Sequence, residues 1–133
     1  MTASLLNDVF LSYSHKDAIW VRGKLLPRLE EHGYSVTVDS RDFRGGSLSV
    51  EEMEKAVLTS RRVLLVLTPS YLDSDWGRFE NAMAQTTDPA VQRKIIPILR
   101  ESCAVPLRLK ILHYRDLRCD DDQQWAYLMR DLI

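Results

Sequence analysis

Cysteines and long apolar runs are scarce in this sequence, and their scarcity excludes several classes of protein. The two cysteines, Cys103 and Cys119, have neither CxxC spacing nor a histidine at a metal-ligand interval, so we expect no zinc site and no disulfide framework. This cysteine usage favours a reducing, cytoplasmic setting. No stretch approaches roughly 18 consecutive apolar residues, and residues 1–14 lack a basic region followed by a long apolar one; we therefore expect no membrane span and no signal peptide.

An excess of either charge is also missing. The 18 basic and 19 acidic side chains give a net charge of -1, which argues against nucleic acid or an anionic membrane surface as the main partner. At 133 residues the chain has the length of a single domain that buries its own core. It ends in an amphipathic stretch without a capping glycine, as expected of a domain cut from a longer multidomain polypeptide.

Short apolar runs alternate with segments of helical periodicity along the chain. The most continuous apolar run, residues 61–68, predicts a strand covered on both faces at the centre of a sheet. Pro27 should kink or re-cap the first helix, and Pro97 predicts an edge position or a local irregularity for its strand. Strands are predicted over 8–14, 34–40, 61–68, 94–100 and 111–117, helices over 17–32, 49–60, 74–85 and 122–133, and an irregular connection over 101–110. This alternation indicates an α/β fold with a doubly wound, five-stranded parallel sheet and helices on both faces.

In such a fold a ligand binds outside the carboxyl ends of the strands, where the strand order reverses. The segments that emerge there are rich in polar and aromatic side chains: SYSHKD (12–17), SRDFRGG (40–46) and TPSYLDSDW (68–76). The first contains no glycine for a pyrophosphate turn, which argues against a dinucleotide fold of the dehydrogenase kind. A response-regulator receiver is excluded because SYSHK and TPS stand where its acidic cluster and its phosphate-accepting aspartate would be. The sequence also lacks a GxSxG elbow and a P-loop.

Trp76 and Glu80 stand four residues apart in the helix expected after the third strand. At that spacing the two side chains share one face of a helix. Trp76 ends the third of the segments above and Glu80 follows one turn later, so both can face the same crevice. The alternative is that Glu80 is a solvated surface carboxylate and that Trp76 packs as a partly buried helix residue.

The chain resembles the Toll/interleukin-1 receptor (TIR) domain family, in the form common in bacterial multidomain proteins. DVFLSYSHKD (8–17) is similar to the first conserved box of the family, and RDFRGG (41–46) occupies the place of its second box and BB loop. RRVLLVLTPSYLDSDWGRFE (61–80) resembles the third strand with the helix that follows, and KIIPIL (94–99) the fourth strand. The resemblance covers essentially the whole chain and implies a flavodoxin-like fold.

Some TIR domains cleave NAD+ at the bond between nicotinamide and ribose, with one glutamate after the third strand and a tryptophan four residues before it. Glu80 and Trp76 match these two positions, so the resemblance implies that Glu80 is catalytic and that Trp76 binds substrate. NAD+ would be the substrate; no cofactor and no metal are expected. Breaking this bond develops oxocarbenium character on the ribose, which a neighbouring carboxylate stabilises.

Other segments have candidate roles in the same site. Ser12, Tyr13 and Ser14 could line the nucleotide site, or they could be ordinary end-of-strand residues. The resemblance places Arg41, Asp42 and Phe43 at the border of the ligand, whereas a surface loop hinged on glycine is the alternative. The interface residues that it implies with a neighbouring TIR domain are Phe43, Arg44, Gly45 and Gly46.

Two functions therefore remain open. The first is an NAD+ nucleosidase that gives nicotinamide and ADP-ribose, or a cyclic isomer, and that is activated by self-association in bacterial defence or signalling. The second is a TIR module that recruits other TIR domains and does no chemistry.

Overall fold

The computed structural model describes residues 7–38, 49–84, 94–110 and 112–133. Its five strands form one parallel sheet in the order β2-β1-β3-β4-β5. The strands are β1 (Asn7–Ser12), β2 (Val36–Val38), β3 (Ser60–Leu67), β4 (Ile95–Leu99) and β5 (Arg115–Asp116). The prediction of an α/β fold with a five-stranded parallel sheet is confirmed.

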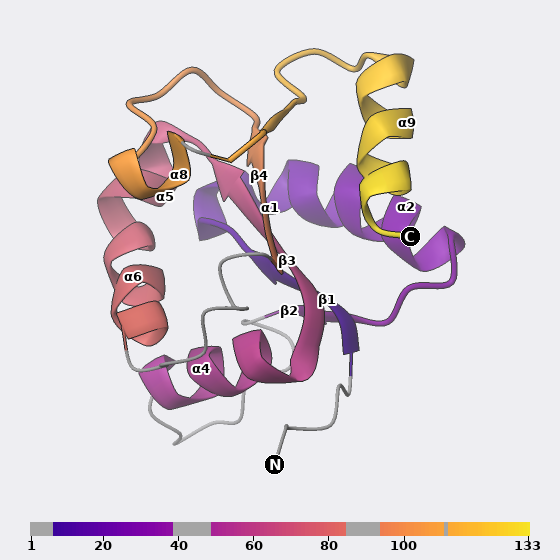
Figure 1. Ribbon diagram of the computed structural model, residues 1–133. Helices are drawn as coiled ribbons and strands as arrows, with labels where there is room; N and C mark the ends of the chain where they lie inside the picture. Colours follow the sequence, from indigo (N-terminus) through magenta and orange to yellow (C-terminus); the bar gives the residue numbers. More distant parts are fainter. Residues whose placement is uncertain (1–6, 39–48, 85–93, 111) are drawn as a thin grey trace.

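Helices cover both faces of this sheet (Figure 1). One face carries η1 (His15–Asp17), α1 (Ala18–Trp20), the π-helical turn η2 (Val21–Leu25), α2 (Leu26–Glu31) and α9 (Asp122–Asp131). The other carries α4 (Ser49–Thr59), α5 (Pro69–Ser74), α6 (Trp76–Ala84) and α8 (Leu107–Lys110). None of the described helices is long and apolar enough to cross a membrane.

The central strand β3 supplies both halves of the hydrophobic core. Leu64 and Val66 pack with α2 and α9, while Val63, Leu65 and Leu67 pack with α4 and α6. Successive side chains of a strand point to opposite faces, and a strand with helices on both sides must therefore be apolar at every position. This arrangement explains the uninterrupted apolar run, and it confirms β3 as the centre of the sheet.

Pro27 changes the helix that precedes it, as expected. The turn over Val21–Leu25 is π-helical, and the N–H of Leu26 donates to the carbonyl of Val21 five residues earlier. Proline removes one backbone donor and its ring collides with the carbonyl four residues before it. A wider turn relieves this collision, and α2 begins anew with Pro27 in its first turn.

Pro97 does not make β4 an edge strand, because β4 lies between β3 and β5. The carbonyl of Leu99 accepts a hydrogen bond from Leu117 on the β5 side, at 2.9 Å. Backbone groups two residues apart in a strand point to the same side, so the nitrogen of Pro97 also faces that side. Since β5 pairs only with Ile98 and Leu99, the missing donor of Pro97 breaks no ladder bond.

Three elements differ from the sequence prediction. Residues 69–73, for which no helix was predicted, belong to α5. Thr68 caps this helix by accepting a hydrogen bond from the N–H of Tyr71, and Pro69 follows. The connection 101–110 contains the short helix α8 directly after Pro106. The fifth strand is limited to Arg115 and Asp116, because the preceding His113 and Tyr114 are exposed and unpaired with β4.

The short strand β5 is held to α9 by an ion pair. The guanidinium of Arg115 donates to both carboxylate oxygens of Asp131, at 2.5 and 2.8 Å. Both side chains are about one-fifth exposed, and two-pronged bonds of this kind are stronger than single ones. The pair therefore fastens the edge of the sheet to the last helix.

Replacing Arg115 with alanine is expected to lower the free energy of unfolding by about 2 kcal/mol, because two charge-assisted hydrogen bonds to a partly buried carboxylate are lost. Lys24→Ala is the matched control, because it breaks the ion pair between Lys24 and Asp120, whose two side chains are 52% and 49% exposed. This change should lower the free energy of unfolding by less than about 1 kcal/mol. Urea denaturation followed by circular dichroism measures both. Equal losses would show that the Arg115 pair has no special role.

Candidate functional site

The strand order reverses between β1 and β3, and polar side chains meet at the carboxyl ends of these two strands. The hydroxyl oxygens of Ser12, at the end of β1, and Tyr71, in α5, lie 2.8 Å apart, and both residues are buried. The hydroxyl of Thr68, directly after β3, donates to the carboxylate of Asp17 in η1 at 2.7 Å. These two bonds tie the segment after β1 to the segment after β3.

The predicted residues after β1 lie at this position, and their side chains are turned inward. Ser12, Tyr13 and Ser14 are all buried. Ser14 caps η1 by accepting a hydrogen bond from the N–H of Lys16, and the Tyr13 hydroxyl accepts one from the guanidinium of Arg22 at 3.1 Å. Ser12 faces the α5 side of the sheet, where it meets Tyr71, whereas Tyr13 packs with the core on the α1–α2 side. The structure therefore brings Ser12, but not Tyr13, to the face that carries α6.

Trp76 and Glu80 lie on α6, which α5 connects to the carboxyl end of β3. Trp76 is half-buried: its ring stacks on that of Phe79, with centroids 6.0 Å apart, and packs against the core. Glu80 is exposed, as are Gly77 and Asn81 on the same helix. The structure thus presents an accessible carboxylate one turn after a partly accessible aromatic ring.

Asp75 precedes this pair and is buried, with 8% of its surface exposed. Its carboxylate accepts a hydrogen bond from the guanidinium of Arg78 at 2.6 Å and lies 2.6 Å from the hydroxyl of Ser74. Sequence reasoning did not single out this residue, although an aspartate directly before a helix is a recognised cap signal.

The remaining predicted residues lie outside the described part of the chain. They are Arg41, Asp42, Phe43, Arg44, Gly45 and Gly46.

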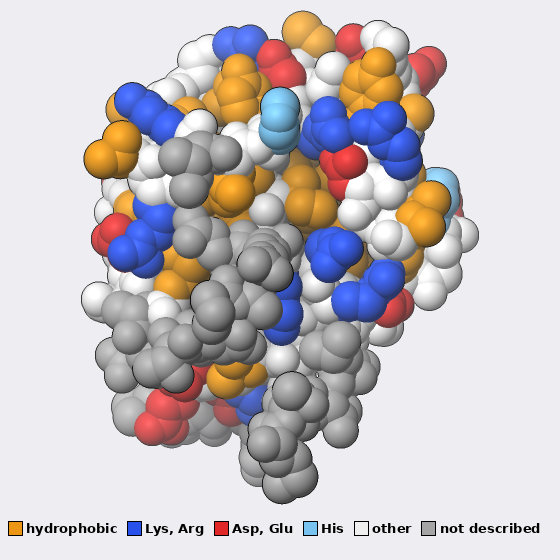
Figure 2. Space-filling view, viewed as in Figure 1, with side chains coloured by type: hydrophobic (Ala, Val, Ile, Leu, Met, Phe, Trp, Pro, Cys, Tyr) orange, Lys and Arg blue, Asp and Glu red, His pale blue; other side chains and the backbone are white. Residues whose placement is uncertain are grey.

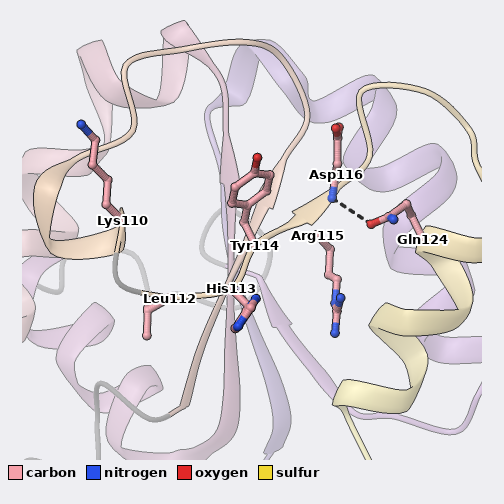
Figure 3. A pocket seen from close by; sticks show the side chains of 7 residues that line it. All are labelled: Lys110, Leu112, His113, Tyr114, Arg115, Asp116 and Gln124. Carbon is pink, nitrogen blue, oxygen red and sulfur yellow. Dashed lines mark hydrogen bonds between the residues drawn. The ribbon is translucent and has the colours of Figure 1, made fainter.

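A separate hollow of about 500 Å³ lies at the β5 edge of the sheet (Figure 3). Its lining residues are Lys110, Leu112, His113, Tyr114, Arg115, Asp116 and Gln124. The side chains of His113 and Arg115 point to one side of the chain, whereas those of Tyr114 and Asp116 point to the other. The amide of Gln124 accepts a hydrogen bond from the backbone N–H of Asp116 at 3.2 Å. This hollow is separated from the β1–β3 boundary by β4.

Charged side chains near this edge are mostly paired with opposite charges. A hydrogen bond to Asp131 raises the pKa of Arg115, and a hydrogen bond from Arg118 lowers the pKa of Asp116. Figure 2 shows acidic side chains among the basic ones over β5 and α9. The hollow therefore presents a surface of balanced charge, without a strong field for an ion.

Metal and thiol chemistry receive no support in the described ranges. No three His, Cys, Asp or Glu side chains gather there as a metal site. Burial raises the pKa of the Cys103 thiol, and the neighbouring Glu101 raises it further, so this thiol stays protonated at neutral pH. Among the predicted site residues that the structure describes, the accessible group that can stabilise a developing positive charge is the Glu80 carboxylate.

Comparison with known proteins gives three main similarities. Toll-like receptor 1 from Homo sapiens is 35% identical over 71 residues, which is 53% of this chain and 9% of the receptor. The crystal structure of the TIR domain of the Toll-related receptor TRR-2 from Hydra magnipapillata has a TM-score of 0.80 at 29% identity, covering 95% of this chain and 98% of that one. A TIR-STING receptor from C. gigas shares the fold, with a TM-score of 0.71 at 24% identity over 95% of this chain and 41% of that one.

These relatives are animal receptors, and the chain spans less than a tenth of the length of Toll-like receptor 1. They therefore do not bear on the bacterial type of domain that the motifs resemble. The sequence model described as TIR domain matches residues 9–130, which is nearly the whole chain. Taken with the strand order and the shared structure, this match shows that the chain belongs to the TIR domain family.

Proposed function

We propose that this TIR domain is an NAD+ nucleosidase that cleaves the bond between nicotinamide and ribose. The observation that supports this proposal is the position of Glu80: an exposed carboxylate on α6, one turn after the half-buried Trp76, on the helix that follows the reversal point of the sheet. Ligands of doubly wound sheets bind at this point. The resemblance of SDWGRFE to the motif of NAD+-cleaving TIR domains points to the same two residues.

The reaction requires little from the protein beyond orientation and charge. The glycosidic C–N bond breaks, its electron pair leaves with nicotinamide, and the ribose carbon develops oxocarbenium character. The Glu80 carboxylate accepts hydrogen bonds from the ribose hydroxyls and stabilises the positive charge. Attack by water, which loses a proton to solvent, gives ADP-ribose, while attack by an adenine nitrogen gives a cyclic isomer.

Other residues bind the substrate in this proposal. Trp76 offers an aromatic face to the nicotinamide or ribose, and Ser12 and Ser14, buried at and after the end of β1, lie beneath the nucleotide. Tyr13 packs on the other face of the sheet and supports this segment from behind. The resemblance to the family assigns Arg41, Asp42 and Phe43, which lie outside the described residues, to the border of the ligand. Glu80 lies on an exposed helix face, and in this proposal a second copy of the domain completes the site. Self-association would then activate the enzyme. The resemblance to bacterial TIR domains places this activity in a defence or signalling system.

Glu80→Gln is expected to abolish nicotinamide release from NAD+, because the amide cannot stabilise a positive charge as a carboxylate does. Glu51→Gln, which changes an exposed glutamate on α4, is the control and should keep wild-type activity. Chromatography of the products at high protein concentration measures both, and thermal unfolding verifies that the variants fold. Normal turnover by folded Glu80→Gln would exclude the proposed role.

Trp76→Leu is expected to reduce kcat/KM about three- to tenfold, since aromatic stacking contributes about 0.5–1.5 kcal/mol beyond the burial of area. Leucine keeps an apolar side chain against Phe79 and the core, where Trp76 is half-buried. Steady-state kinetics measures the change. Unaltered kinetics would assign Trp76 to packing alone.

Assembly without catalysis is the second candidate, and two observations favour it. The relatives reported above are named as receptors. Large apolar side chains are also strongly exposed on two helices: Ile19 on α1, at 91%, and Leu107 on α8, at 81%. Exposed apolar side chains are common contact points between proteins.

Phe43→Ala should weaken self-association of the domain in sedimentation velocity, because the resemblance places Phe43 at the contact with a neighbouring TIR domain. Ile19→Ala in parallel tests whether α1 contributes to the contact. If wild-type protein self-associates but releases no nicotinamide, even when it is tethered into oligomers, the assembly function replaces the enzymatic one. Association unchanged by Phe43→Ala would exclude the loop at 41–46 as the interface.

A further inference from the structure

Asp75 is the residue at which α5 ends and α6 begins. Its backbone N–H donates to the carbonyl of Tyr71 at 2.8 Å, and its own carbonyl accepts from the N–H of Phe79 at 3.2 Å. The first bond belongs to the end of α5, and the second is the first hydrogen bond of α6. The backbone of this one residue therefore joins the two helices.

The carboxylate of Asp75 connects the same two helices. On the α5 side it lies 2.6 Å from the Ser74 hydroxyl, which is also 2.7 Å from the carbonyl of Ser70. On the α6 side it accepts a hydrogen bond from Arg78 at 2.6 Å. The Asp75 side chain is 11% exposed and that of Arg78 is 39% exposed. A carboxylate so far removed from water requires these partners, because an unpaired buried charge is costly.

The start of α5 is in turn fixed to the sheet. Thr68 caps the helix from the end of β3, and the Tyr71 hydroxyl contacts Ser12 at the end of β1. Trp76 is the residue after Asp75, and Glu80 follows one turn later. Together with the packing of Phe79 in the core, the orientation of α6 relative to α5 thus sets where the side chains of Trp76 and Glu80 lie.

We propose that Asp75 is a positioning residue for Trp76 and Glu80: its carboxylate holds α6 in a fixed orientation relative to α5. For Glu80 this inference rests on the proposed NAD+ cleavage. For the placement of Trp76 it does not, which allows a test that is independent of activity.

Fluorine NMR of protein labelled with 5-fluorotryptophan provides this test. The chain has three tryptophans, and Trp76→Phe identifies the resonance of Trp76. In Asp75→Ala we expect that resonance to move and to become more sensitive to solvent, while those of Trp20 and Trp125 stay in place. Asp73→Ala, which removes an exposed carboxylate from α5, is the matched control and should change none of the three.

Kinetics gives the second measurement. Asp75→Ala should lower kcat about tenfold to a hundredfold, since a small misplacement of a catalytic group has effects of that size. KM should change less than kcat. Asp75→Asn keeps an oxygen that can accept from Arg78 and should restore part of both the resonance position and kcat; if Asp75→Ala does not fold, Asp75→Asn and Arg78→Met replace it.

The outcomes separate the two hypotheses. An unmoved Trp76 resonance in folded Asp75→Ala would overturn the positioning role, whatever the kinetics. If wild-type protein releases no nicotinamide, the proposed enzymatic function fails, and the resonance of Trp76 alone decides whether Asp75 positions α6. A moved resonance with unchanged kcat would overturn the part of the inference that concerns Glu80.

Discussion

The parallel pairing of β1 with β3 is the constraint on which the arrangement of this domain depends. The pairing runs from Asn7 opposite Ser60 to Ser12 opposite Leu65. The last three paired residues of β3, from Val63 to Leu65, are fully buried. Because the two strands end side by side, the segments that leave them must meet there. The hydrogen bonds Ser12–Tyr71 and Asp17–Thr68 join the two segments. They also give partners to polar groups whose burial without a hydrogen bond would lower stability.

This constraint also separates the candidate site from the hollow at the β5 edge. The hollow lies at β5, an edge strand of two residues, among charges that neutralise one another. At the β1–β3 boundary the polar side chains are hydrogen-bonded to one another, and the exposed Glu80 lies on α6, which follows α5. An exposed carboxylate suits a reaction whose main requirement is stabilisation of positive charge.

Much of the fold could be predicted from the spacing of apolar residues. A strand covered on both faces is apolar at successive positions, whereas an amphipathic helix has apolar residues on one face only. Residues 61–68 and 49–60 are examples, and the structure matches both closely. The short elements α5 and α8 were missed because four to six residues give no periodic signal, although Thr68 and Pro69 are a cap and a first-turn proline. Asp75 could not be recognised as a link between helices without its contacts to Ser74 and Arg78.

The position of the ligand is the central claim, and an NMR titration with a non-cleavable NAD+ analogue tests it most directly. Backbone amide shifts report binding at each residue without any requirement for turnover. The account predicts that the largest shifts fall on residues 76–81 of α6 and on the residues after β1 and β3, 13–17 and 68–71. Shifts confined to the β5 hollow, residues 112–118, or no shifts at millimolar analogue would contradict it.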